Sequence, residues 1–387
     1  LNEALCTNAY RANMYSGMMG PVNNNLGYLQ YVLVAVAGAW LMSRGGGVAV
    51  GALMSFLLLT RSFNQPISQV SNQINAIVMA LAGAERIFEI IDIEPEVDEG
   101  KVTLERVKEN ADGTLSKADY DTGAWAWKKP DGTLVPLRGD VRFDHVVFGY
   151  DDRKIILHDI SLFAKPGQKI AFVGSTGAGK TTITSLINRF YEIQSGTITY
   201  DGIDVRDIRK DSLRRSLGIV LQDTHLFTGT VADNIRYGKL DATDAQVEAA
   251  ARAVSADTVV AKLEKGWDSD VGEGGGRLST GEKQLISFAR AVLADPRIFV
   301  LDEATSSIDT QTEQLIQQAI DHLLQDRTSF LIAHRLSTIR KADMILVVRD
   351  GRIVEQGTHQ ELLRRHGYYH DLYSKQFAEE SAARILQ

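Results

Sequence analysis

The distribution of apolar residues divides the chain into unlike parts. From Leu26 to Ser43 the sequence LGYLQYVLVAVAGAWLMS contains no charged residue. With the flanking PVNNN it approaches the length of about 20 residues that crosses a bilayer. A glycine-rich break at 44–47 is followed by a second apolar run, VAVGALMSFLLLT. We therefore expect a helical hairpin in a membrane; a buried hairpin of a large soluble protein is the alternative, because the first run is near the lower length limit.

The second helix of this hairpin becomes amphipathic along its length. Apolar residues recur at spacings of three and four, namely Phe63, Ile67, Val70, Ile74, Ile77 and Leu81. Asn and Gln occupy the other faces, and exposed amides in lipid lose their water partners. We expect this stretch to line a water-filled cavity or to leave the membrane, with Pro66 kinking it. A solvated structural helix is the alternative.

Residues 94–140 are polar and differ from both neighbours. Asp112-Gly113 and Asp131-Gly132 are turn signals, and the alternation of WAW at 125–127 predicts a strand. We interpret this segment as a linker or insertion. Its tryptophans are interpreted as packing residues, with a ligand platform as the alternative.

From Val141 onward, short apolar strands alternate with helical stretches, the pattern of an α/β domain with a largely parallel sheet. The expected organisation is therefore a partial membrane domain at 1–93, the linker or insertion at 94–140 and the α/β domain at 141–387.

Composition adds three limits to this picture. The 387 residues are 44% apolar and 24% charged, which is ordinary for folded protein. The net charge of -7 argues against broad nucleic-acid binding, which usually needs a basic excess. Cys6 is the single cysteine, so an internal disulfide is excluded. The sequence begins at Leu1 with no charged region leading into a cleavable signal, and we expect the C-terminal part of a longer polypeptide.

The strongest motif lies at the start of the α/β domain. After the strand QKIAFV comes GSTGAGKTT, which matches the phosphate-loop pattern GxxxxGK[ST] and leads into the helix TITSLINRF. Its backbone N–H groups are expected to cradle phosphates, with Lys180 reaching the β and γ groups and Thr181 holding Mg²⁺. The candidate residues are Gly174, Ser175, Thr176, Gly177, Ala178, Gly179, Lys180, Thr181 and Thr182. A bare glycine-rich turn is the alternative.

Two acids follow a later apolar strand in RIFVLDEATSSID. Asp302 ends the strand and is placed like the residue that holds the Mg²⁺ of a nucleotide. Glu303 could orient and deprotonate a water that attacks the γ-phosphate. Surface carboxylates at a strand end are the alternative.

The order of these motifs is typical of one family. Along the chain come Tyr150 in FGY, the phosphate loop, Gln222 in IVLQD, LSTGE at 278–282, Asp302 with Glu303, SSID ending at Asp309, and His334. The chain resembles ATP-binding cassette (ABC) exporters, in which each half has six transmembrane helices followed by a nucleotide-binding domain. The resemblance implies that the hairpin holds the fifth and sixth helices. It also implies a cassette with a mostly parallel sheet, an antiparallel β subdomain and a helical subdomain.

The resemblance further implies roles for individual residues. Tyr150 would stack on adenine, Gln222 would sense Mg²⁺ and the membrane domain, and His334 would contact the γ-phosphate. Lys180, Glu303 and His334 would be catalytic, with ATP and Mg²⁺ as cofactors. In this family two cassettes face each other head to tail, so part of each cassette serves the nucleotide of its partner. The residues concerned would be Ser279, Gly281, Glu282 and Asp309.

The implied partners are a second half-transporter, membrane lipid and a transported substrate that the sequence does not reveal. The implied location is a bacterial plasma membrane, with the nucleotide-binding domain in the cytoplasm.

The signature LSTGE departs from the family pattern LSGGQ at two positions. Thr280 replaces a glycine while Ser279 and Gly281 remain. Glu282 keeps a capping box with Ser279 but adds a negative charge. At about 8 Å from a partner's γ-phosphate and an effective dielectric constant of about 20, the repulsion is roughly 2 kcal/mol per unit charge. We therefore favour a heterodimer with one weakened ATP site over a homodimer.

Three classes of function are compatible with these motifs. An ATP-driven exporter is favoured, because an apolar hairpin precedes the cassette on one chain. A soluble cassette ATPase would need the hairpin to be a soluble core. A regulatory or channel cassette that does not hydrolyse ATP is disfavoured by Glu303 and His334.

Overall fold

The computed structural model describes residues 2–151, 153–221, 224–302, 310–332 and 336–375. The chain forms two units, Leu1–Val97 and Asp98–Gln387. Gln222, Glu303, Asp309 and His334, all predicted as site residues, lie outside the described residues.

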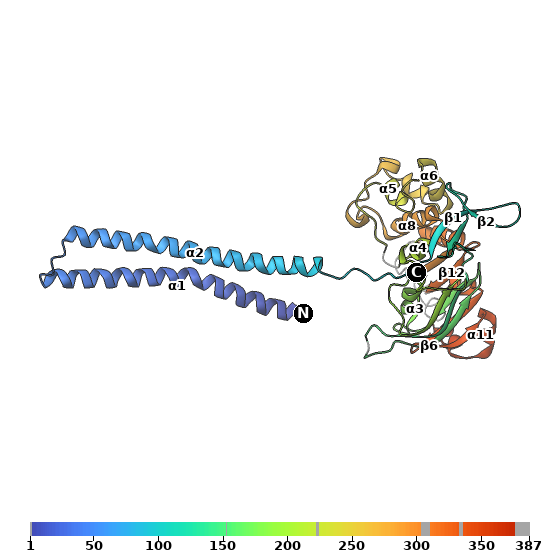
Figure 1. The fold of residues 1–387 in the computed structure, drawn as a ribbon, viewed down its shortest axis with the longest axis horizontal. Helices are drawn as coiled ribbons and strands as arrows, with labels where there is room; N and C mark the ends of the chain where they lie inside the picture. The colour runs from blue at the N-terminus through green and yellow to red at the C-terminus, as the bar shows by residue number, and fades with distance from the viewer. Residues whose placement is uncertain (1, 152, 222–223, 303–309, 333–335, 376–387) are drawn as a thin grey trace. The chain divides into compact units, whose positions relative to one another are not determined.

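The first unit is the predicted helical hairpin. Helices α1 (Asn2–Ser43) and α2 (Val50–Ile91) lie side by side and are joined by a short connection (Figure 1). Gly45 and Gly47 in the connection have φ angles of 75° and 66°, which glycine adopts without strain. The helices approach closely at Gly38, where a Cβ atom would lie 2.2 Å from Leu53 Cδ1. Within the described residues, α1 is long and apolar enough to cross a membrane, and the apolar part of α2 is the shorter Val50–Ser62.

The second unit begins at Asp98, and its first element is a four-stranded antiparallel sheet of order β2-β1-β3-β4. Its strands are β1 (Thr103–Glu109), β2 (Leu115–Lys117), β3 (Trp125–Lys128) and β4 (Leu134–Pro136). Trp127 is fully buried, and its indole N–H donates to Asp201 Oδ2 at 2.9 Å. Asp201 also accepts backbone hydrogen bonds from residues 138–140, so this segment is attached to the rest of the unit. Trp127 is therefore a packing residue.

A second antiparallel sheet has the order β6-β5-β8-β9. It contains β5 (Val141–Phe148), β6 (Leu157–Ala164), β8 (Ser195–Tyr200) and β9 (Ile203–Asp204). The alternating burial of β5 and β6 places one face of this sheet on the main hydrophobic core.

The central sheet has six strands in the order β10-β11-β12-β7-β13-β14. They are β7 (Lys169–Val173), β10 (Leu217–Val220), β11 (Ile298–Asp302), β12 (Thr328–Ile332), β13 (Met344–Arg349) and β14 (Arg352–Gly357). Pairings are parallel except between β13 and β14. The inner strands are buried on both faces, as parallel strands covered by helices require.

Some helices lie next to this sheet in the sequence, and others form a separate, largely helical region. Helix α3 (Lys180–Ile187) follows β7, and α4 (Lys210–Ser216) precedes β10. Helices α5 (Val231–Arg236), α6 (Asp244–Ala253), α7 (Asp257–Val260) and α8 (Thr280–Ala294) come between β10 and β11 and share one core. Further helices in the described part of the unit include α9 (Thr310–Leu323), α10 (Leu336–Arg340) and α11 (His359–Arg365). The predicted fold class, a helical hairpin plus a P-loop domain with an antiparallel β part and a helical part, is confirmed.

Candidate nucleotide-binding site

The phosphate loop runs from the end of β7 to the start of α3 and depends on glycine at two close approaches. A Cβ atom on Gly174 would lie 2.1 Å from the Val348 carbonyl oxygen of β13. A Cβ atom on Gly179 would lie 2.8 Å from Leu157 Cδ2, and the φ angle of Gly179 is 108°. Larger residues at these positions would push the loop off the sheet. The motif glycines therefore let the backbone turn sharply against its own core.

Lys180 is folded into this loop. Its side chain is buried, with 7% of the residue exposed, and Nζ donates to the Gly174 carbonyl at 2.7 Å and to the Ser175 carbonyl at 2.9 Å. Burial lowers the pKa of Lys180, and the nearby charge of Asp302 acts in the opposite direction. A buried ammonium is stabilised by hydrogen bonds and by a nearby negative charge, which Asp302 and a bound phosphate can both supply. The loop therefore fits a phosphate group.

The first turn of α3 offers further donors. Its N-cap is Gly179 in a left-handed conformation, and no side chain caps the helix. The early N–H groups of an uncapped helix and its macrodipole both attract an anion. Thr181 in this turn is exposed, whereas Thr182 is buried.

Tyr150 joins the phosphate loop from the end of β5. Its hydroxyl lies 3.1 Å from Thr182 Oγ1. Its ring packs edge to face against Phe148 and Tyr191, with centroid distances of 5.1 and 5.0 Å, and 53% of the residue is exposed. The site thus has an exposed aromatic surface next to α3. Sequence reasoning missed Tyr191, because nothing in its local sequence marks it as a neighbour of Tyr150.

Asp302 lies at the C-terminal end of β11, as predicted. Strands β11, β12 and β7 are parallel neighbours, so Asp302 and the phosphate loop share the same edge of the sheet. In the parallel ladder, Asp302 lies opposite Ile332 of β12. The negative charge of Asp302 is close enough to Lys180 to raise the pKa of that lysine. A carboxylate at this position can serve a cation bound with phosphate.

The predicted signature begins helix α8. Ser279 is its N-cap and forms a capping box with Glu282. The backbone N–H and the hydroxyl of Ser279 both donate to Glu282 Oε2 at 2.9 Å, and Ser279 Oγ accepts from the Glu282 N–H at 3.4 Å. Ser279 is exposed and Gly281 is buried. The predicted capping box is therefore present.

Helices α3 and α8 belong to different hydrophobic cores of the second unit. Figure 1 shows α8 grouped with α5 and α6, whereas α3 lies in the other half of the unit. Helix α8 packs against α5, α6 and α9. The structure thus brings Tyr150, Lys180, Thr182 and Asp302 together around the phosphate loop.

Comparison with known proteins identifies the domain. Residues 157–306 match the family model described as ABC transporter. The chain carries an ABC transporter ATP-binding domain. Its curated relatives include the uncharacterized ABC transporter ATP-binding protein YfiC of Bacillus subtilis, 42% identical over 97% of this chain and 58% of the relative. The fatty acid ABC transporter ATP-binding/permease protein of Mycobacterium tuberculosis is 44% identical over 96% of this chain and 54% of the relative.

A solved structure extends this similarity to the fold. The bacterial Atm1-family ABC exporter with ATP bound matches with 36% identity and a TM-score of 0.63, covering 92% of this chain and 58% of that chain. The resemblance to ABC exporters predicted from motif order is confirmed. The chain spans just over half the length of these relatives.

Proposed function

We propose that this chain is part of an ATP-driven exporter. The observation that carries the proposal is Lys180, a desolvated ammonium held in the phosphate loop at an uncapped helix start. The family match assigns this domain to ATP binding, and the relatives include proteins named as ATP-binding/permease. The apolar helix α1 on the same chain supports a place in a membrane, and we propose a bacterial plasma membrane with the second unit in the cytoplasm.

Different residues around the phosphate loop would bind the phosphates, the adenine and the Mg²⁺ of the nucleotide. The N–H groups from Gly177 to Thr181 would hold phosphate oxygens, and Lys180 would reach the β and γ groups. The exposed ring of Tyr150 would stack on the adenine. We propose Thr181, Asp302 and Gln222 as the Mg²⁺ site, where the cation would neutralise charge on the β and γ phosphates. Of these three, Thr181 and Asp302 are described, and both are accessible at the edge of the sheet.

For hydrolysis we propose Glu303 as the general base and His334 as a γ-phosphate contact, beside the stabilising charge of Lys180. The Glu303→Gln variant should bind ATP with near-normal affinity and lose most of its turnover, because the amide cannot accept a proton from water. Equilibrium ATP binding and phosphate release from the full-length transporter measure the two properties.

A matched control for Glu303 is Glu248→Gln on helix α6. Glu248 forms an ion pair with Arg252 at 2.7 Å, away from the phosphate loop, and its variant should keep full turnover. Hydrolysis by Glu303→Gln at the rate of the control would reject the proposed base.

We further propose that two halves act together. The Ser279, Gly281 and Glu282 end of α8, with Asp309, would close over the ATP held by the partner's phosphate loop. The division of the second unit supports this arrangement, because α8 packs in the helical core and the phosphate loop and α3 pack in the main core. The proposed organisation is a partial membrane domain at 1–93, a linker or insertion at 94–140 whose four-stranded sheet belongs to the second unit, and a cassette at 141–387.

The charge of Glu282 favours a partner that differs from this chain. A carboxylate facing the partner's γ-phosphate weakens one ATP site and leaves the site on this chain able to work with a better signature. We therefore propose a heterodimer. Equal ATP turnover at both sites of a product purified from this gene alone would end that proposal.

A further inference from the structure

The inserted sheet, formed by β1–β4 within residues 94–140, has a role that the nucleotide site does not explain. The segment is anchored in the main hydrophobic core through Val102, Leu104, Trp127 and Leu137. The same core contains residues of the phosphate loop and of α3. The inserted sheet is therefore fixed to the part of the second unit that carries the phosphate loop.

A turn of the inserted sheet, residues 121–124 before β3, reaches the helical region. Asp121 Oδ2 accepts a hydrogen bond from Lys239 Nζ at 2.5 Å, and only 21% of the lysine side chain is exposed. This hydrogen bond lowers the pKa of Asp121, so the pair is ionised at neutral pH. The Gly123 carbonyl accepts a second hydrogen bond, from Arg297 Nη2 at 3.1 Å. Because Lys239 follows α5 and Arg297 follows α8, the turn contacts the chain just beyond both helices.

The turn is held in shape by its own side chains. Asp121 Oδ1 accepts from the Gly123 N–H at 3.2 Å, and the φ angle of Gly123 is 69°. The Thr122 hydroxyl donates to the Val107 carbonyl of β1 at 2.6 Å. These bonds leave Asp121 Oδ2 directed at Lys239. The carboxylate is therefore preorganised for its partner in the helical region.

The residue before Lys239 lies directly against α8. A Cβ atom on Gly238 would lie 2.1 Å from the Arg290 carbonyl oxygen and 3.3 Å from the Ala294 backbone nitrogen. Arg290 Nε in turn donates to the Asn234 carbonyl of α5 at 2.8 Å. Backbone thus lies against backbone at this point. A shift of Lys239 would therefore shift the last turns of α8 as well.

The inserted sheet and the helical region share no apolar core. Within the described residues, the helical core has no member from 98–140. A cavity of about 380 Å³ has walls from both parts, including Trp125 of β3 and Leu293 of α8. The polar contacts of Asp121 and Gly123 therefore join the two parts, and their removal leaves both cores intact.

We propose that the inserted sheet holds α8 in place relative to the main core, with Asp121 and Lys239 as positioning residues. This inference rests on the proposed role of α8, whose first residues close over the ATP of the partner. A small displacement of a group that contacts reacting atoms lowers the rate steeply. The ion pair beyond the last turn of α8 thus favours the position in which Ser279 meets the phosphates of the partner's nucleotide.

The test measures backbone hydrogen exchange of α8 in the full-length transporter in phosphatidylcholine nanodiscs without nucleotide. Lys239→Ala should speed exchange of residues 288–294 by about twofold to fivefold, the range for a partly exposed ion pair. Asp121→Asn should have the same effect, because it removes the charge and keeps an acceptor for the turn. The double variant should exchange no faster than either single variant, since both lose one interaction.

Two further variants separate positioning from a general loss of stability. Lys239→Arg keeps the charge and should retain wild-type exchange of α8. Lys117→Ala removes another ion pair of the inserted sheet, in which Lys117 Nζ lies 3.1 Å from Glu105 Oε2. Both residues of that pair belong to the inserted sheet, so this control should leave α8 unchanged.

A second measurement adds the non-hydrolysable analogue AMP-PNP with Mg²⁺ and follows residues 280–285 at the start of α8. Nucleotide bound beneath α8 should protect these amides from exchange. Lys239→Ala should raise the analogue concentration for half-maximal protection by about twofold to fivefold, because a smaller fraction of the protein holds α8 ready for binding.

The possible outcomes separate this inference from the proposed function. Unchanged exchange at 288–294 in folded Lys239→Ala, an equal change in Lys117→Ala, or additive effects in the double variant would overturn the inference. An unshifted analogue concentration would overturn it as well. If the analogue protects no part of α8 in the wild type, the proposed contact of α8 with a nucleotide is rejected. The exchange measured without nucleotide then still decides whether the inserted sheet holds α8.

Discussion

Helices α3 and α8 both begin with residues that suit an anion, but they differ in N-terminal capping. No side chain caps α3, whereas a capping box closes the first turn of α8. Helix α3 follows a left-handed Gly179, has no side-chain cap and keeps Lys180 within its loop. Helix α8 follows Ser279, whose backbone N–H and hydroxyl both donate to Glu282 Oε2. One helix start is open to a phosphate, and the other already holds a carboxylate of its own.

This difference shows that a helix start and its dipole do not by themselves make a phosphate site. Helix α11 repeats the arrangement of α8, because Thr358 caps it in a box with Glu361 and nearly the same distances. No nucleotide role is implied for α11. The role proposed for α8 therefore rests on its place in the family's motif order, and the charge of Glu282 should set how well it serves a partner.

The largest effect is expected at the open helix start. Lys180→Ala should lower ATP turnover by about 10²-fold to 10³-fold, the range for loss of one preorganised donor at developing charge. Phosphate release from the full-length transporter measures it. Lys165→Ala, which removes an exposed lysine near the other end of β7, is the matched control and should change turnover little. Near-normal turnover by Lys180→Ala would show that the loop does not hold the reacting phosphate.

The next effect is expected at the closed helix start. Glu282→Gln keeps an acceptor for the capping box and removes the charge. Relief of roughly 2 kcal/mol of repulsion corresponds to a gain of up to about 30-fold in turnover at the partner's site. Single-turnover hydrolysis, with the partner's phosphate loop intact and Lys180→Ala in this chain, isolates that site. Unchanged or lower turnover would mean that Glu282 does not face the partner's γ-phosphate.

The smallest effect concerns the cap alone. Glu282→Ala and Glu361→Ala each remove a capping-box carboxylate, and each should lower the free energy of unfolding by about 1 kcal/mol. Thermal unfolding of the full-length protein compares the two losses. ATP turnover should change for Glu282→Ala and not for Glu361→Ala. A change at both positions would mean that capping, and not a nucleotide contact, explains the role of Glu282.

Features encoded within a few residues could be predicted from the sequence. The spacing of Ser279 and Glu282 predicted the capping box, and the pattern GxxxxGK[ST] predicted the loop between β7 and α3. The apolar runs on either side of the glycine-rich break predicted the hairpin. In each case the partners are neighbours along the chain, so a local pattern is sufficient.

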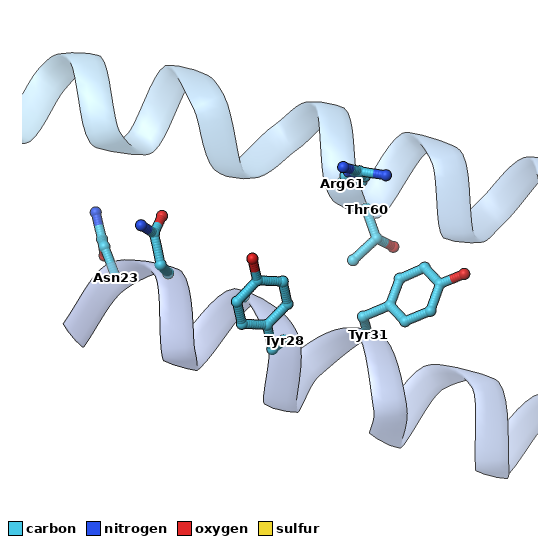
Figure 2. Close-up of a pocket in the computed structure, with 7 residues that line it drawn as sticks. Asn23, Tyr28, Tyr31, Thr60 and Arg61 are labelled. Atoms are coloured by element: carbon cyan, nitrogen blue, oxygen red, sulfur yellow. The ribbon is translucent and has the colours of Figure 1, made fainter. Parts of the chain in front are cut away.

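Contacts between distant residues could not be predicted in this way. Tyr191 beside Tyr150, Asp201 beneath Trp127 and the Val348 carbonyl against Gly174 each join segments that the fold alone brings together. A cavity lined by Tyr28 of α1 and Arg61 of α2 is of the same kind, because the two residues belong to different helices (Figure 2). Periodicity placed the helices, but it did not show which polar groups would line one cavity.

The amino-acid order by itself determined the hairpin, the parallel sheet and the glycine loop, because hydrogen bonding and backbone sterics act over a few residues. The tertiary structure alone decided how the helix starts are used. Burial around Lys180 leaves a desolvated cation that a nearby anion stabilises, whereas the exposed start of α8 satisfies its donors with Glu282. Desolvation depends on every segment that covers a group, and it exists only once the chain has folded.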